Sequence, residues 1–105
     1  SRKQWLLNHL HSSGFIKIDE GAFKAVKNNK SLLPAGVVEV GGNFNRGDVI
    51  SVFFTKKEKI AIGISAYDIS EAKKIIGKKS KEIPHILGYE GRDEIIHKDD
   101  LVRII

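Results

Sequence analysis

The stretch KSLLPAGVVEVGGNFNRGDVI (residues 30–50) decides the fold, because turn residues stand on both sides of an apolar run. It holds Pro34, one of two prolines in the chain, and four of the ten glycines. The β-branched residues after Gly36 predict a strand. Gly47 and Asp48 predict a tight turn that leads into the next strand. The stretch therefore indicates short strands joined by sharp corners.

Further strands are predicted on both sides of this stretch. The clearest is KIAIGIS (residues 59–65), where Ile60, Ile62 and Ile64 alternate with small or polar residues and should share one face. The other predicted strands are residues 14–19, 36–40, 48–54, 93–97 and 101–105, with a weaker candidate at residues 4–8. Six or seven strands in so short a chain favour a small sheet that is closed or nearly closed.

Three short helices are predicted, at residues 20–29, 68–77 and 80–88. In the second, Asp68 and Glu71 have the spacing of a capping box, and Gly77 stands where a left-handed cap is expected. The third carries Pro84 early and ends at Gly88. The fold class expected from these elements is mainly β, of the α+β type.

Composition narrows the class of protein. The chain has 105 residues, which is one domain, and it contains no cysteine, so disulfides and thiolate metal sites are excluded. No apolar run approaches the length needed to cross a bilayer, and no signal-peptide pattern opens the chain. We therefore expect a cytoplasmic domain without a membrane partner. The absence of a starting methionine suggests a piece of a longer protein.

Positive charge is concentrated in two parts of the chain. The net charge is +5; residues 1–30 carry six cationic side chains against two acidic ones, and residues 56–81 carry eight lysines against three acids. Clustered positive charge attracts polyanions such as RNA. The alternative is a solvated lysine-rich surface, which charge alone does not exclude.

No catalytic or metal-binding constellation is predicted. Arg46-Gly47-Asp48 is interpreted as a turn, and HKDD (residues 97–100) as a solvated turn without a visible nucleophile. His9 and His11 would point the same way on a strand, but a third metal ligand at matching spacing is missing.

The segment from residue 24 to residue 36 is the best candidate for a binding site. Basic, amide and hydroxyl side chains end the first predicted helix, and Gly36 then brings the backbone back into a strand. The side chains are those of Lys24, Lys27, Asn28, Lys30 and Ser31. Such groups hold phosphate and sugar. The alternative is a helix C-terminus whose lysines suit the helix dipole, followed by a buried Leu-Leu-Pro segment.

Most of the chain, from about Gly14 to its end, closely resembles the C-terminal PUA domains of bacterial glutamate 5-kinases. The most specific segments are DEGA (residues 19–22), SLLPAG (31–36), FNRGD (44–48), GISAYDIS (63–70), SKEIPHILGY (80–89) and HKDD (97–100). The resemblance implies a mixed-strand pseudo-barrel of about six strands with two or three short helices. It also implies that Leu32, Leu33 and Phe44 belong to the core.

The resemblance further implies that residues 14–105 are the PUA domain and that residues 1–13 are an edge or linker from a preceding kinase domain. That kinase domain would phosphorylate L-glutamate with ATP and Mg²⁺ in the first step of proline synthesis. None of its glutamate-, ATP- or metal-binding segments is present in this sequence. The chain itself is therefore expected to have no catalytic residue and no cofactor.

By the same resemblance, the surface formed by the first helix and the SLLPAG corner is where related PUA domains hold structured RNA. The residues predicted to do so are Lys24, Lys27, Asn28, Lys30, Ser31 and Gly36, with Lys73, Lys78 and Lys79 as a flanking basic patch. No DNA partner is expected.

Two other functions remain open at this point. The domain could dock on its own kinase domain or subunits and control oligomeric state and feedback by proline, with Trp5 in the docking edge. It could instead be the RNA-targeting PUA domain of an RNA-modifying enzyme, although the SKEIPHILGY and HKDD segments favour the kinase family.

Overall fold

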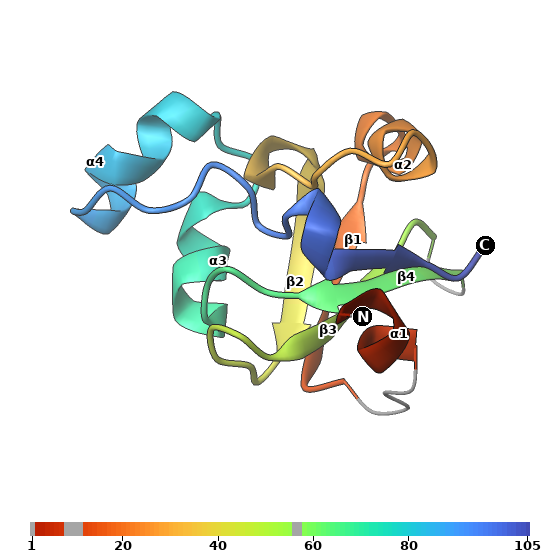
Figure 1. The fold of residues 1–105 in the computed structure, drawn as a ribbon. Helices are drawn as coiled ribbons and strands as arrows, with labels where there is room; N and C mark the ends of the chain where they lie inside the picture. The colour runs from red at the N-terminus through yellow and green to blue at the C-terminus, as the bar shows by residue number, and fades with distance from the viewer. Residues whose placement is uncertain (1, 8–11, 56–57) are drawn as a thin grey trace.

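A computed structural model describes residues 2–7, 12–55 and 58–105 (Figure 1). Five strands and four α-helices form the described fold, together with three short 3-10 turns. In chain order they are α1 (Arg2–Leu7), β1 (Gly14–Ile18), α2 (Glu20–Lys27), η1 (Pro34–Gly36), β2 (Val37–Gly42), β3 (Val49–Phe53), β4 (Lys59–Ile64), α3 (Ile69–Ile75), η2 (Ser80–Glu82), α4 (Ile83–Leu87), η3 (Lys98–Asp100) and β5 (Leu101–Arg103).

The five strands form one mixed sheet in the order β2-β1-β3-β4-β5. β1 lies antiparallel to β2 and parallel to β3, and the pairs β3–β4 and β4–β5 are antiparallel. A parallel pair needs a crossover connection, and here α2, η1 and β2 supply it between β1 and β3. The predicted α+β fold class is confirmed, with five strands where about six were expected.

Side chains on both faces of the sheet are buried. The main core lies on the face covered by α2 and α3 and contains Ile16, Val26 and Ile75, all with no exposed area. α1 packs on β4 and β5 (Figure 1). Its Leu6 forms a second buried cluster with Val49, Ile62 and Val102 of the sheet. Burial on both faces explains why β3 is apolar almost throughout instead of alternating.

The prediction that Ile60, Ile62 and Ile64 share one face is wrong at Ile60. The β3–β4 register shifts between Val52, which lies opposite Ala61, and Phe53, which lies opposite Lys59. Ile60 is the extra residue of this bulge and turns into the main core, while Ile62 and Ile64 face α1.

Two predicted strands are not strands. Residues 4–8 were the weaker candidate, and α1 occupies residues 2–7 because its buried Leu6 packs on β4 and β5. In residues 93–97, Ile95 and Ile96 are fully buried, but the backbone makes only one isolated bridge, to Leu32. Apolar residues can therefore enter a core from a crossing segment as well as from a strand.

The three predicted helices are confirmed, and their caps follow the sequence signals. Asp68 and Glu71 form the expected capping box, with the Asp68 carboxylate 2.8 Å from the Glu71 amide nitrogen and the Glu71 carboxylate 3.1 Å from the Asp68 amide nitrogen. Gly77 and Gly88 both adopt left-handed φ angles, of 76° and 79°. Among the described residues, no helix is long and apolar enough to span a bilayer.

Candidate nucleic-acid interface

The corner between α2 and β2 is held by backbone hydrogen bonds. The amide of Asn28 donates to Lys24 O at 3.0 Å, and Asn29 takes a left-handed φ of 58° that turns the chain. The amide of Lys30 then donates to Ala25 O at 2.9 Å. Asparagine tolerates this conformation better than most residues, so NNK at residues 28–30 suits a reversal at the end of the helix.

Leu32 and Leu33 have different environments, although both were predicted to lie in the core. Leu32 has no exposed area, and its backbone bridges Ile96, with an N···O distance of 2.9 Å from the Leu32 amide. Leu33 is 44% exposed, because the next residue in this extended segment points the other way. The prediction is therefore confirmed for Leu32 and wrong for Leu33. Phe44, the third predicted core residue, is buried.

Gly36 lets the corner approach α2 closely. A Cβ atom at this position would lie 2.7 Å from the Cβ of Ala22, closer than packed carbon atoms can come. Its carbonyl accepts a hydrogen bond from the amide of Asp19 at 2.9 Å, just before α2 begins. The glycine therefore has a structural role in joining the N-terminal turn of α2 to η1.

A hollow of about 500 Å³ lies between α2 and this corner. We call it the corner hollow; its lining includes Ala22, Ala25, Lys30, Ser31, Leu33 and Gly36. Three of the predicted RNA-contacting residues, Lys30, Ser31 and Gly36, thus share one concave surface.

The corner hollow combines apolar walls with a few polar groups. Leu33 supplies an exposed apolar wall, and Lys30 supplies an exposed ammonium group. The Ser31 hydroxyl accepts a hydrogen bond from the Lys98 amide at 2.7 Å and keeps its own hydrogen to donate. The carboxylate of Asp19, also in the lining, caps α2 by accepting from Ala22 N at 2.9 Å. This arrangement can hold a sugar or base against the walls and a phosphate at the rim.

The other predicted residues of this helix lie outside the lining. Lys24, Lys27 and Asn28 are exposed on the neighbouring surface of α2 and around its end. The Lys27 ammonium lies 4.8 Å from the centre of the Phe23 ring. These residues therefore extend the positive surface beside the corner hollow without forming its walls.

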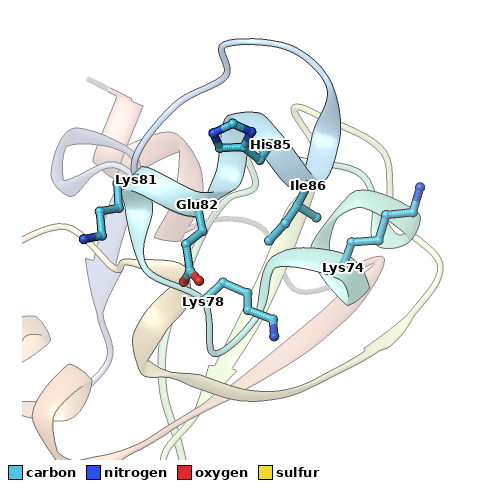
Figure 2. Close-up of a pocket in the computed structure, with 6 residues that line it drawn as sticks. All are labelled: Lys74, Lys78, Lys81, Glu82, His85 and Ile86. Carbon is cyan, nitrogen blue, oxygen red and sulfur yellow. The ribbon is translucent and has the colours of Figure 1, made fainter.

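Of the flanking patch, only Lys78 lines a second concavity. This α3–α4 groove has a volume of about 590 Å³ and is lined by Lys74, Lys78, Lys81, Glu82, His85 and Ile86 (Figure 2). The predicted Lys73 and Lys79 are exposed but are not part of its lining. Sequence reasoning missed Lys74, Lys81 and His85. No local signal could have found them, because α3 ends at Ile75 and Gly77 turns the chain before Lys78, so helical spacing does not relate these lysines.

Arg46, predicted only as a turn residue, forms the most connected polar cluster in the described structure. Gly47 has the positive φ of 87° that the predicted turn requires. The Arg46 guanidinium makes a two-point contact with the Glu71 carboxylate, at 3.0 Å from Nε and 2.5 Å from Nη2. The Tyr89 hydroxyl hydrogen-bonds both groups. The cluster ties the β2–β3 turn to α3 and to the end of α4.

The Arg46–Glu71–Tyr89 cluster shifts the pKa values of its members. Hydrogen bonds from Arg46 lower the pKa of Glu71 from 4.5 to about 2. Loss of hydration, together with the hydrogen bond to Glu71, raises the pKa of Tyr89 to about 12. Both groups therefore keep one protonation state over the physiological range. The cluster is suited to fixing geometry and not to transferring protons.

The remaining sequence candidates form no reactive centre within the described part of the chain. His9 and His11 lie outside the described residues. In residues 2–7, 12–55 and 58–105, no three histidine or acidic side chains are grouped as a metal site would require. HKDD is not the fully solvated turn that was predicted. His97 caps η3, which spans Lys98–Asp100, and Asp100 is buried.

Comparisons with known proteins bear on the family and the fold. The family model described as the PUA domain matches residues 14–87. Glutamate 5-kinase of Allorhizobium ampelinum is 50% identical over 102 residues, which is 97% of this chain and 26% of that protein. Glutamate 5-kinase of Agrobacterium fabrum is 51% identical with the same coverage. The chain thus spans about a quarter of the length of these relatives and matches their C-terminal region.

Solved structures share the fold at lower identity. A crystal structure of a PUA domain from Aeropyrum pernix K1, in complex with tartrate, has a TM-score of 0.60 and 24% identity over 81% of this chain and 41% of that one. A chain of the archaeal box H/ACA sRNP Nop10–Cbf5 complex has a TM-score of 0.50 and 19% identity over 90% of this chain and 24% of its own length. With the family model matched over most of its length, the chain belongs to the PUA domain family.

Proposed function

We propose that this chain is the non-catalytic C-terminal PUA domain of a glutamate 5-kinase and that its corner hollow binds structured RNA. About half of the residues are identical to glutamate 5-kinases over 97% of the chain, which supports the first part. In this proposal residues 14–105 are the domain, and residues 1–13 join it to a kinase domain. ATP and Mg²⁺ would belong to that kinase domain.

The observation that carries the RNA proposal is the composition of the corner hollow. Lys30 and Ser31 line it together with apolar residues such as Leu33, and the exposed Lys24 and Lys27 continue the positive surface along α2. RNA presents charged phosphates beside sugars and bases, so a mixed surface suits it better than a purely charged one. A chain of the archaeal box H/ACA sRNP Nop10–Cbf5 complex shares this fold, and its place in a ribonucleoprotein supports the RNA proposal.

A second function is favoured by a different surface. Trp5 on α1 and the terminal Ile104 and Ile105 are each about half exposed, at 50%, 51% and 52%. α1 packs on β5, which precedes these isoleucines (Figure 1). Apolar side chains of this size favour contact with protein. The domain could therefore dock on its own kinase domain or subunits and control oligomeric state and feedback by proline.

The third possibility, an RNA-targeting domain of an RNA-modifying enzyme, is the least supported. The curated relatives at about 50% identity are glutamate 5-kinases, whereas the structure from the H/ACA complex is 19% identical.

The test of the RNA proposal is a titration of this domain with transfer RNA at several salt concentrations, read by fluorescence anisotropy. Each lysine that contacts a phosphate contributes about 0.7 to 0.9 to the slope of log affinity against log salt. The variant K24A/K27A/K30A should therefore flatten the slope by about 2 units. A control, K17A/K59A/R92A, removes the same charge from β1, β4 and the segment after α4, and should change the slope much less.

Two results would contradict the RNA proposal. One is weak binding that the two triple variants reduce equally, because this would indicate a general effect of net charge. The other is no measurable binding at low salt, which would leave the docking function as the better account.

A further inference from the structure

The α3–α4 groove is built by two segments that face each other. Lys74 comes from α3, Lys78 follows that helix and Lys81 lies in η2, while His85 and Ile86 come from α4 (Figure 2). The segment between the two helices is short and is fixed at both ends, by the positive φ of Gly77 and by the bond from the Lys79 amide to Glu82 Oε2 at 2.9 Å. The backbone that positions these lysines is therefore held in one conformation.

Charge in the α3–α4 groove is not compensated by the protein. Three lysines face one carboxylate, Glu82, so two positive charges remain even with His85 neutral. In the part of the chain that the structure describes, none of these three lysines forms an ion pair or a side-chain hydrogen bond. Glu82 already accepts the backbone amide of Lys79. Like charges held near one another repel, and an anionic ligand would relieve that repulsion.

The arrangement of the ammonium groups indicates the shape of the ligand. In Figure 2 the ammonium ends of Lys81, Lys78 and Lys74 point in different directions and do not converge on one point. A single small anion would contact only one of them. A chain of phosphates can contact all three, while Ile86 offers an apolar surface to the sugars between the phosphates.

The α3–α4 groove adjoins the corner hollow through the backbone of η1. The Gly77 amide, just before Lys78, donates to Pro34 O at 2.7 Å. Pro34 begins η1, and Ala35 and Gly36 of the same turn line the corner hollow. The two concavities therefore lie on either side of one rigid turn.

We propose that the α3–α4 groove holds a second segment of the phosphate backbone of the RNA that occupies the corner hollow, so that one RNA molecule lies across η1. This inference rests on the proposed function of the corner hollow. Lys74, Lys78 and Lys81 contact phosphates, and His85 can donate a further hydrogen bond through its ring N–H. The α3–α4 groove adds affinity and sets orientation without reading sequence.

The experiment uses the variant K74A/K78A/K81A in the same transfer RNA titration, beside the corner variant K24A/K27A/K30A, the control K17A/K59A/R92A and the combination of the two site variants. All substituted lysines of the α3–α4 groove are exposed, so the melting temperature should not change. We expect the groove variant to flatten the salt slope by about 2 units, and the combined variant by about 4. The stoichiometry should stay at one RNA per domain.

The outcomes separate this inference from the proposed function. If only the corner variant weakens binding beyond the control, the inference is overturned and the proposed function stands. If only the groove variant does so, the assignment of RNA to the corner hollow fails. A change from two RNA molecules per domain to one in the groove variant would overturn the claim that a single RNA crosses η1. Equal effects of all three triple variants would overturn both proposals.

Discussion

At Gly36 the backbone passes so close to α2 that a Cβ atom would lie 2.7 Å from the Cβ of Ala22. G36A should therefore push the corner away from the helix and lower the free energy of unfolding by about 1–3 kcal/mol. Gly21 is the matched control, because a Cβ there meets only Asp19 Oδ1, at 3.5 Å. G21A should leave stability unchanged or raise it by up to about 1 kcal/mol through helix propensity. Urea denaturation of both variants measures the difference, and equal stabilities would contradict the close approach.

The neighbouring leucines of the corner give a second prediction at the same scale. L32A empties a fully buried site and should cost about 2–5 kcal/mol of unfolding free energy. L33A truncates an exposed side chain and should change stability by no more than about 0.5 kcal/mol. Thermal or chemical unfolding of the pair is the measurement. A large loss in L33A would mean that Leu33 is covered in solution.

The same pair shows where residue-scale reasoning from sequence stops. Residue type marks Leu32 and Leu33 alike as candidates for the core. In a helix or a long strand the period would separate them, but this segment makes one bridge before η1 begins, so no period is available. The sequence predicted that Gly36 brings the backbone back into a strand, and β2 begins at the next residue. The close contact of Gly36 with Ala22 could not be predicted without the fold, because it depends on how η1 packs on α2.

At the scale of elements, local signals were reliable and contacts between distant segments were not. In the caps of α2 and α3, a carboxylate accepts a hydrogen bond from the backbone amide three residues later. Such a short-range pattern can be recognised in the sequence. Arg46 and Tyr89 are 43 residues apart, and no local sequence pattern indicates that they are in contact. α1 was misassigned for a related reason. A short apolar run does not distinguish helix from strand until its partner surface, here β4 and β5, is known.

The Arg46–Glu71–Tyr89 cluster predicts a pH dependence of stability. The pKa of Glu71 is about 2 in the folded protein and near 4.5 when unfolded, so the unfolded state takes up the proton first as the pH falls. The stabilisation from ionised Glu71 is thus complete above about pH 4.5 and is lost between that pH and about 2.

The variant E71Q keeps the capping geometry of α3 but lacks the titrating group. It should be less stable than the parent protein at pH 7, and the difference should shrink as the pH falls from 4.5 toward 2. Denaturant unfolding at several pH values tests this. A difference that stays constant over the range would contradict the assigned pKa shift.

At the scale of the whole molecule, the sequence shows which stretches carry positive charge, but it does not show which lysines lie together on the surface. Residues 1–30 contribute one lysine, Lys30, to the corner hollow, and residues 56–81 contribute Lys74, Lys78 and Lys81 to the α3–α4 groove. Three predicted residues, Lys30, Ser31 and Gly36, share the corner hollow, and Lys78 lies in the α3–α4 groove. Which lysines face a common concavity depends on how helices pack. That is why Lys73 and Lys79 were chosen and Lys74 and Lys81 were not.

The central claim is that the corner hollow is the surface that RNA occupies. The most direct measurement is a two-dimensional NMR titration of the ¹⁵N-labelled domain with a short RNA hairpin, which reports each backbone amide separately. The account predicts the largest shifts at Lys30, Ser31 and Gly36, with further shifts at Lys78 and Lys81 as the RNA crosses η1. Shifts confined to Trp5 and the residues around Ile104 would contradict it, and would assign RNA to the surface formed by α1 and the residues that follow β5.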